Sequence, residues 1–326
     1  MKTTDRRSFL QTSLGGFAGL ASMPLLASLT GCQNVPSRQS GESAAASTAA
    51  RTAPLPMAKL TDSVSVISDA PGNVVVLSSS DGVLLVDSGA ASMAKAVRAS
   101  LAGANVHTLF NTHYHPDQTG GNALFGAGGA VIHAHSITRE WLATDYYVPA
   151  DDRWVKALPA KALPTVTFRL KGETRAGAEN IEFGYLLEAH TRGDIYVFFR
   201  DSNVLAVGDV ASPLRDPVLD WYAGGWLGGR VDAMTSLLAL ANDQTQIVPA
   251  YGPVMTRAQL QAERDMMAHL YDRTSLLTTQ GRSAKDMLDA GVMGEVDRKF
   301  QDPYRFLYDD AKGLWAHYTN FGGNIV

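Results

Sequence analysis

The segment NTHYHPDQTGGN, residues 111–122, is the most informative part of this chain. It follows residues 106–110, an apolar run whose composition predicts a β-strand. Alternate side chains of an extended backbone share one face, so His113, His115 and Asp117 can converge on one point. Imidazole and carboxylate groups are accepted zinc ligands. The spacing therefore predicts a metal cage directly after a strand.

Two successive sets of strands and helices surround this segment. The expected strands are residues 64–67, 73–77, 82–86, 106–110, 130–133, 165–170, 181–187, 195–199, 204–207 and 246–249. The expected helices are residues 91–101, 231–241 and 257–277, and the last fifty residues read as further helices. Two runs of strands, each closed by helices, favour two sheets packed face to face with helices outside. We expect the helical tail to pack on the domain or to cover part of its mouth.

Three more segments follow the histidine motif in a defined order. They are EAHTRGD at residues 188–194, VLAVGD at residues 204–209 and IVPAYGP at residues 247–253. With these motifs, roughly residues 60–270 resemble the metallo-β-lactamase-fold hydrolases. The resemblance implies an α+β fold, a four-layer αβ/βα sandwich, here with a helical C-terminal extension.

The same resemblance implies the ligands of two metal sites. His113, His115 and His190 would form the first site, Asp117 would belong to the second, and Asp209 would bridge the two. The implied cofactor is Zn²⁺, one or two ions, with iron and manganese as alternatives.

Two positions depart from the family pattern. Family members usually carry histidine where this chain has Gln118, and usually end the last motif with histidine where Tyr251 stands. As a metal ligand Gln118 offers only a neutral amide oxygen, and Tyr251 must lose a proton of pKa near 10 before it coordinates strongly. The second site is therefore expected to be weak, and a single-metal enzyme is an open alternative.

The expected function is hydrolysis of a small ester, thioester, lactone or amide, β-lactams included, by metal-bound hydroxide. Asp117 could orient the water and pass its proton to the leaving group, and Tyr251 could hydrogen-bond the developing oxyanion. One alternative is a metal-binding protein with a degraded second site and little or no catalysis. Another is an iron-dependent oxidoreductase, although nothing in the chain resembles the flavin domain that such a protein usually needs.

Other polar and aromatic residues are given structural roles. Asp194 is expected to cap or buttress its loop, and His133 and His135 are expected to be structural because no carboxylate follows them. Aromatic residues cluster in two stretches, residues 141–154 and 221–226, the second of them rich in glycine. Both could line a substrate cleft, although aromatics pack in cores at least as often.

The bulk composition excludes several classes of protein. The 326 residues, 45% of them hydrophobic and 18% charged, suffice for a full core. A net charge of −4 without a Lys/Arg block argues against nucleic-acid binding, so the expected partner is a small-molecule substrate. The sequence does not indicate an oligomeric state.

The first residues have the pattern of an export signal. Arg6 and Arg7 precede a mildly apolar stretch, which resembles a twin-arginine signal, with a membrane-spanning anchor as the less favoured reading. Residues 29–32, LTGC, resemble a lipobox, and Cys32 is the only cysteine. We expect an exported, periplasmic lipoprotein, anchored to the membrane through lipid on Cys32. The expected parts are a signal at residues 1–31, a flexible linker at 32–57, the catalytic domain at 58–275 and the helical extension at 276–326.

Overall fold

The computed structural model describes residues 51–148 and 152–318. The predicted signal, the lipobox with Cys32 and most of the predicted linker lie outside the described residues. In the part of the chain that is described, no helix is long and apolar enough to cross a membrane.

The first sheet contains the strands that lead into the histidine motif. Its order is β1-β2-β3-β4-β5-β6-β9, antiparallel from β1 to β4 and parallel from β4 to β9. The strands are β1 (Met57–Lys59), β2 (Val64–Ile67), β3 (Val74–Ser79), β4 (Gly82–Val86), β5 (Val106–Phe110), β6 (Val131–His135) and β9 (Val166–Phe168). The antiparallel pairing at the start of the domain gives way to parallel pairing once helices connect the strands.

The second sheet carries the other ligand-bearing loops. Its order is β10-β11-β12-β13-β14, antiparallel except for the parallel pair β13 and β14. The strands are β10 (Lys171–Ala176), β11 (Glu179–Tyr185), β12 (Ile195–Phe199), β13 (Val204–Gly208) and β14 (Gln246–Pro249). A separate two-stranded hairpin joins β7 (Tyr146–Val148) to β8 (Arg153–Val155).

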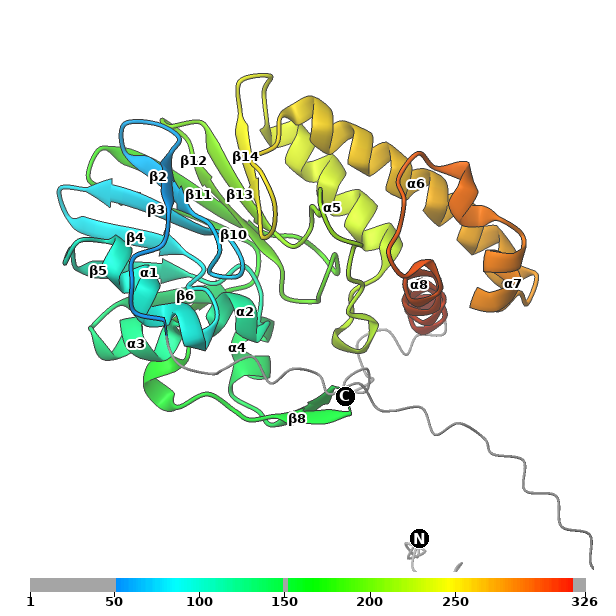
Figure 1. The fold of residues 1–326 in the computed structure, drawn as a ribbon, viewed down its shortest axis with the longest axis horizontal. Coiled ribbons are helices and arrows are strands. Elements are labelled where there is room, and N and C mark those ends of the chain that lie inside the picture. The colour runs from blue at the N-terminus through cyan, green and yellow to red at the C-terminus, as the bar shows by residue number, and fades with distance from the viewer. Residues whose placement is uncertain (1–50, 149–151, 319–326) are drawn as a thin grey trace, which may run out of the picture. The chain divides into compact units, whose positions relative to one another are not determined.

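Helices cover the outer face of each sheet (Figure 1). The helices of the first half are α1 (Ala94–Ser100), α2 (Pro116–Thr119), α3 (Asn122–Ala127) and α4 (Ser136–Leu142). Those of the second half are α5 (Leu227–Leu240), α6 (Arg257–Thr279), α7 (Ala284–Asp289) and α8 (Pro303–Tyr318). Side chains of α1 and α3 pack on the first sheet, those of α5 and α6 pack on the second, and α7 and α8 add to the same helical layer.

Strict alternation along the strands produces these layers. On β3, Val75 and Leu77 face the second sheet, whereas Val74 and Val76 face α1 and α3. On β12, residues 195, 197 and 199 face the first sheet, and residues 196 and 198 face the helices. A period of two separates an inter-sheet core from two sheet-to-helix cores. The predicted four-layer sandwich with a helical C-terminal region is confirmed.

Some elements differ from the sequence expectation for a physical reason. The sequence predicts neither β10, an edge strand whose Lys171, Glu173 and Arg175 are exposed, nor the hairpin of β7 and β8. Charges suit an edge strand because they discourage pairing with another chain, yet they hide the strand from a hydrophobicity pattern. Helix α5 begins at Leu227, four residues before the predicted start, despite its two early glycines.

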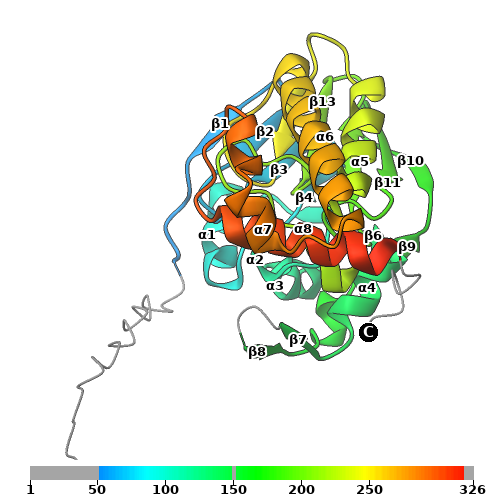
Figure 2. The same ribbon diagram turned by 90° about the vertical axis from the view of Figure 1, so that its right-hand side faces the viewer.

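The C-terminal helices pack on the helices that cover the second sheet. Helix α8 contacts both α6 and α7 and crosses below α6 in Figure 2. The fully buried Asp310 lies in α8, near the hydroxyl of Thr274 in α6. Burial raises the pKa of the Asp310 carboxyl to about 7, although the contact with Thr274 opposes the rise.

We expect Asp310→Asn to stabilise the protein more at pH 8 than at pH 5. A carboxyl whose pKa is raised by folding contributes stability below its unfolded value near 4, and this contribution is lost as the pH rises to about 7. The variant removes that loss, on the order of 2 kcal/mol between the two pH values. Urea unfolding at both pH values measures it, with the exposed Asp272→Asn of α6 as control. An equal effect of Asp310→Asn at both pH values would contradict the assignment.

Candidate metal centre

The histidine motif begins where β5 ends and runs in extended form into α2. His115 caps α2 with φ −61° and ψ 144°, and Pro116 takes the first helical position, where a missing N–H costs nothing. Alternate side chains of the stretch before α2 share one side, which brings His113 and His115 together. The local backbone thus prepares two of the three predicted imidazoles.

His190 reaches these two residues from the second sheet. It lies in the loop between β11 and β12. In the described parts of the chain, the candidate ligand atoms of His113, His115 and His190 all lie within 4.8 Å of one another. His113 and His190 are buried, and His115 is partly exposed. The structure therefore brings the three predicted ligands of the first site together, with one of them accessible.

Each imidazole has one nitrogen facing an oxygen atom of the protein. Thr112 Oγ1 lies 3.0 Å from His113 Nδ1, and Asp220 Oδ2 lies 3.0 Å from His115 Nε2. Asp194 Oδ1 lies 3.5 Å from His190 Nδ1. Hydrogen bonds of this kind, which His113 and His115 make, fix the ring orientation and the tautomer of a metal-binding histidine, whereas the contact of His190 with Asp194 is an ion pair without a hydrogen bond. The three contacts leave His113 Nε2, His115 Nδ1 and His190 Nε2 for an ion.

A second layer of contacts holds these oxygen atoms in place. Asp87 follows β4 with φ +63°, and its carboxylate accepts hydrogen bonds from Thr112 N at 2.8 Å and Thr112 Oγ1 at 2.7 Å. Asp194 accepts from Thr191 N at 2.6 Å and Thr191 Oγ1 at 2.9 Å, so it buttresses the His190 loop as predicted. Asp220 also accepts from the buried hydroxyl of Tyr114.

Sequence reasoning missed Asp87 and Asp220. Asp87 carries a weak signal in the sequence, because it is the first charged residue after an apolar strand. Asp220 carries none, since it lies in an irregular loop 105 residues from His115.

The electrostatics of the three histidines and Asp209 suit cation binding. Burial, with the nearby positive charges of His190, His115 and Arg215, lowers the pKa of His113 well below its usual value. Burial opposes ionisation of His115, but the hydrogen bond and charge of Asp220 raise its pKa. Burial would raise the pKa of Asp209, yet His190 and Arg215 lower it, so the carboxylate is ionised.

Asp209 reaches the centre at the end of β13. Its Oδ2 lies 3.6 Å from His190 Nε2, and Ser212 Oγ donates to Oδ1 at 3.3 Å. The preceding Gly208 has φ +58°, and a Cβ there would lie 2.8 Å from the side chain of Thr112. Only glycine therefore permits both the turn and the close approach to Thr112.

The residues expected at a second metal are joined to one another or to an arginine. The hydroxyl of Tyr251 donates to Asp117 Oδ2, and Arg215 donates to Asp209 Oδ2. The guanidinium carbon of Arg215 lies 3.5 Å from the centre of the Tyr251 ring. Gln118 is buried beside Gly72, and neither atom of its amide group has a hydrogen-bond partner among the described residues.

The first set of residues fits a divalent ion. Three imidazoles with oriented rings and one accessible side match a catalytic zinc site, which keeps a position open for water or substrate. His190 supports this fit, because neither of its buried ring nitrogens has a hydrogen-bond partner within the described chain, and an ion could occupy Nε2. The second set does not fit as well, since Asp117, Asp209 and Tyr251 already have partners.

Two adjoining cavities open at the centre. The first, of about 260 Å³, is lined by His115, Asp117 and Asp209 and by Arg215 and Arg305. The second, of about 790 Å³, has a largely apolar and aromatic wall that includes Tyr114, Trp141, Leu142, Tyr146 and Leu158. Residues 116, 117, 146 and 153 line both cavities. Arg305 comes from α8, so the C-terminal extension forms part of the wall, as expected.

The two aromatic stretches have divided roles. Trp141, Tyr146 and Tyr222 line the cavities, but Trp154 is 64% exposed on β8. Trp226 stacks on His317 of α8 with ring centres 3.7 Å apart, so it belongs to helix packing.

The glycines beside the second aromatic stretch serve the His190 loop. A Cβ at Gly225 would lie 2.0 Å from the carbonyl oxygen of His190, and one at Gly229 would lie 2.1 Å from that of Glu188. These glycines let the start of α5 pack directly on the loop that carries His190. This close packing explains why α5 starts earlier than its composition predicts.

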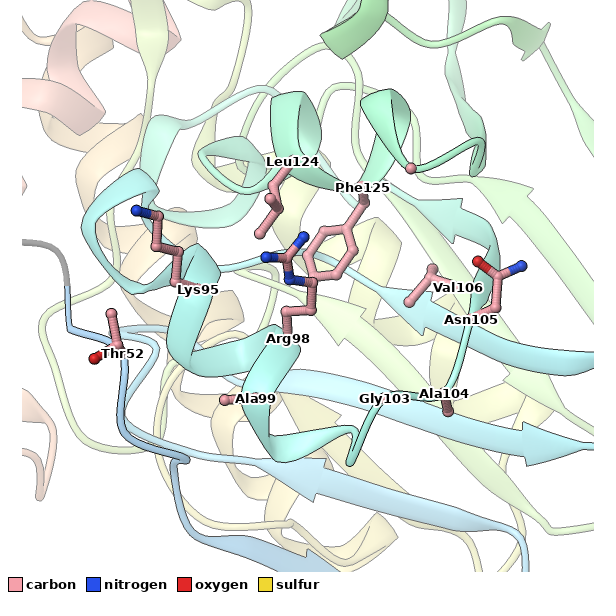
Figure 3. A pocket seen from close by; sticks show the side chains of 11 residues that line it. Thr52, Lys95, Arg98, Ala99, Gly103, Ala104, Asn105, Val106, Leu124 and Phe125 are labelled. Atoms are coloured by element: carbon pink, nitrogen blue, oxygen red, sulfur yellow. The ribbon is translucent and has the colours of Figure 1, made fainter.

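A separate cavity of about 570 Å³ lies beside α1 and α3 (Figure 3). Thr52, Lys95, Arg98 and Asn105 supply its polar side chains, and Leu124 and Phe125 supply apolar ones. None of its lining residues is histidine, cysteine or a carboxylic acid. This cavity therefore lacks the side chains that would bind a metal ion, in contrast to the histidine cluster.

We expect Asp220→Asn to weaken Zn²⁺ binding by about 10- to 100-fold while the protein stays folded. The substitution removes the charge that orients His115 through Nε2. Competition with a chelating dye measures the affinity, and circular dichroism reports the fold. The matched control is Asp232→Asn, on the exposed face of α5. Unchanged affinity in Asp220→Asn would show that Asp220 does not support the ligand.

Solved structures with a similar fold include three hydrolases by their names. The sec-alkylsulfatase Pisa1 from Pseudomonas sp. aligns with a TM-score of 0.57 and 16% identity, over 83% of this chain and 51% of that one. A metallo-beta-lactamase from Pontibacter korlensis gives a TM-score of 0.53 and 18% identity, over 66% of this chain and 99% of its own. The DIM-1 metallo-beta-lactamase gives a TM-score of 0.53 and 15% identity, over 67% of this chain and 99% of its own. This chain thus spans about half the length of the alkylsulfatase, and at these identities the likeness concerns the fold.

No curated protein matches the sequence of this chain. The sequence model of the metallo-beta-lactamase superfamily, however, matches residues 67–250, more than half of the chain. That range includes both sheets' ligand-bearing loops and His113, His115 and His190. The chain therefore belongs to the metallo-beta-lactamase superfamily.

Proposed function

We propose that this protein is a zinc-dependent hydrolase acting on a small ester, thioester, lactone or amide. The observation that carries the proposal is the convergence of His113, His115 and His190, of which His115 lines the smaller of two adjoining cavities. A divalent ion held by three imidazoles lowers the pKa of a bound water to about 7 and so supplies hydroxide at neutral pH.

Asp117 is the group placed to move a proton. It lines both cavities next to His115. Tyr251 donates to Oδ2 of Asp117, which leaves Oδ1 able to accept a proton from the attacking water and deliver it to the leaving group. In this arrangement Tyr251 acts by orienting Asp117 rather than by binding the developing oxyanion, because its single hydroxyl proton is already engaged.

The cavities describe the kind of substrate. The larger cavity has an aromatic and aliphatic wall, so it favours an apolar group on one side of the scissile bond. The smaller cavity, which His115 lines, leaves room for the bond that is hydrolysed. β-Lactams and sulfate esters are the substrates named for proteins of similar fold, and both belong in a substrate screen.

The test combines metal content with hydrolysis by the full chain. We expect the wild-type protein to bind zinc and to hydrolyse at least one substrate in a panel of esters, thioesters, lactones, amides, β-lactams and alkyl sulfates. His113→Ala should lose both metal and turnover. Tyr251→Phe should keep its metal but lose about 10- to 100-fold in kcat, because Asp117 loses its positioning partner.

Other outcomes would change the interpretation. Bound zinc without turnover on any substrate would favour the alternative, a metal-binding protein of the same fold without catalysis. Absence of bound metal under zinc-replete conditions would overturn the hydrolase proposal. Loss of metal in Tyr251→Phe would make Tyr251 a ligand.

We also propose that the protein is exported and held to a membrane through lipid on Cys32, a residue outside the described structure. The support is the order of Arg6-Arg7, an apolar stretch and the LTGC motif. We expect Cys32→Ala to move the protein from the membrane fraction to the soluble fraction of the periplasm. Wild-type protein in the soluble fraction, or Cys32→Ala still bound to membranes, would contradict the lipid anchor.

A further inference from the structure

Arg215 lies in the position where a second cation would be expected. It belongs to the loop between β13 and α5, and its side chain, one-third exposed, lines the smaller cavity. Its guanidinium donates to Asp209 Oδ2 and lies over the Tyr251 ring with 3.5 Å between Cζ and the ring centre. One positive group thus contacts two of the residues expected at a second metal site.

A third such residue joins this group indirectly. Tyr251 donates to Asp117, so Asp209, Arg215, Tyr251 and Asp117 form one continuous chain of contacts. Gln118 takes no part in it, because its amide lies against Gly72. Both carboxylates expected to hold a second ion are therefore engaged by other side chains.

The backbone of this arginine is held by the C-terminal extension. Arg298 donates to the carbonyl oxygen of Arg215. The next residue, Asp216, accepts hydrogen bonds from the backbone N–H groups of Gln301 at 2.8 Å and Asp302 at 2.7 Å. A segment more than eighty residues away thus fixes the loop and directs Arg215 toward Asp209.

We propose that the Arg215 guanidinium replaces a second metal ion, so that the protein binds a single divalent cation at its three histidines. The inference rests on the proposed function, since it concerns the same centre. A guanidinium is permanently charged and pairs with carboxylates and aromatic faces, so it can neutralise Asp209 and support Tyr251 without a metal. A dication beside it would meet a like charge and only neutral or protonated donors at Gln118 and Tyr251.

The experiment measures metal stoichiometry rather than activity. The full chain, its Arg215→Ala and Arg215→Lys variants and the control Arg305→Ala are titrated with Co²⁺, whose visible bands report each site. Elemental analysis after Zn²⁺ loading gives the number of ions per chain. Arg305 lines the same cavity but pairs with Asp309 at 2.5 Å. Its substitution therefore removes a positive charge from the cavity but leaves the contact between Arg215 and Asp209 in place.

A second pair of variants separates the effect of Arg215 from the weak metal binding expected of Gln118 and Tyr251. Gln118→His with Tyr251→His restores two imidazoles, and it is compared with the same double variant carrying Arg215→Ala. We expect the second ion to bind at least about tenfold more tightly when Arg215 is absent. The wild type, Arg215→Lys and Arg305→Ala should each bind one ion.

Each result decides the matter. Two tightly bound ions in the wild-type protein would overturn the inference and leave the hydrolase proposal standing. Equal affinity for the second ion with and without Arg215, in the double-histidine background, would overturn the role of Arg215. No bound ion in the wild type would overturn this inference together with the proposed function.

Discussion

The orientation of three imidazole rings toward one point is the constraint on which this structure depends. A histidine side chain can rotate and can carry its proton on either nitrogen, so three of them bind a metal well only when each ring is fixed. Here Thr112, Asp220 and Asp194 each face one ring, and Asp87 holds Thr112 in turn. The oxygen atoms come from three loops, so the fold must keep those loops in register.

The sandwich of two sheets meets that requirement. Strands of both sheets end near one edge, where the loops after β4, β5, β11 and β13 supply Asp87, the motif of residues 111–122, His190 and Asp209. The inter-sheet core is built from β-branched, aliphatic and aromatic side chains that alternate strictly along each strand. Because protein interiors are close-packed, this core restricts the movement of the strand ends that carry the loops. Glycines then allow the remaining loops to approach within contact distance, as at Gly225 beside His190.

Charge balance is a second constraint on the centre. Asp209 is buried and ionised, so it needs a cation, and Arg215 provides one whether or not a metal is near. The same arginine supports the ring of Tyr251, whose hydroxyl holds Asp117 at the cavity wall. The C-terminal extension positions Arg215 through its backbone and adds Arg305 to the cavity. The C-terminal extension thus lines the cavity beside the candidate metal centre as well as packing on the domain.

Local periodicity was sufficient to predict most of the strands and to favour two face-to-face sheets with helices outside, because alternation and turn residues act over a few neighbouring positions, whereas the four-layer sandwich was implied by the family resemblance. The spacing of His113 and His115, and the loop role of Asp194, were likewise readable from short segments. The contacts of Asp220 with His115 and of Arg298 with the Arg215 loop were not, since they join positions 105 and 83 residues apart. No pattern within either segment records its partner. Those contacts, and with them the environment of the metal centre, exist only because the packed sheets bring distant loops to one edge.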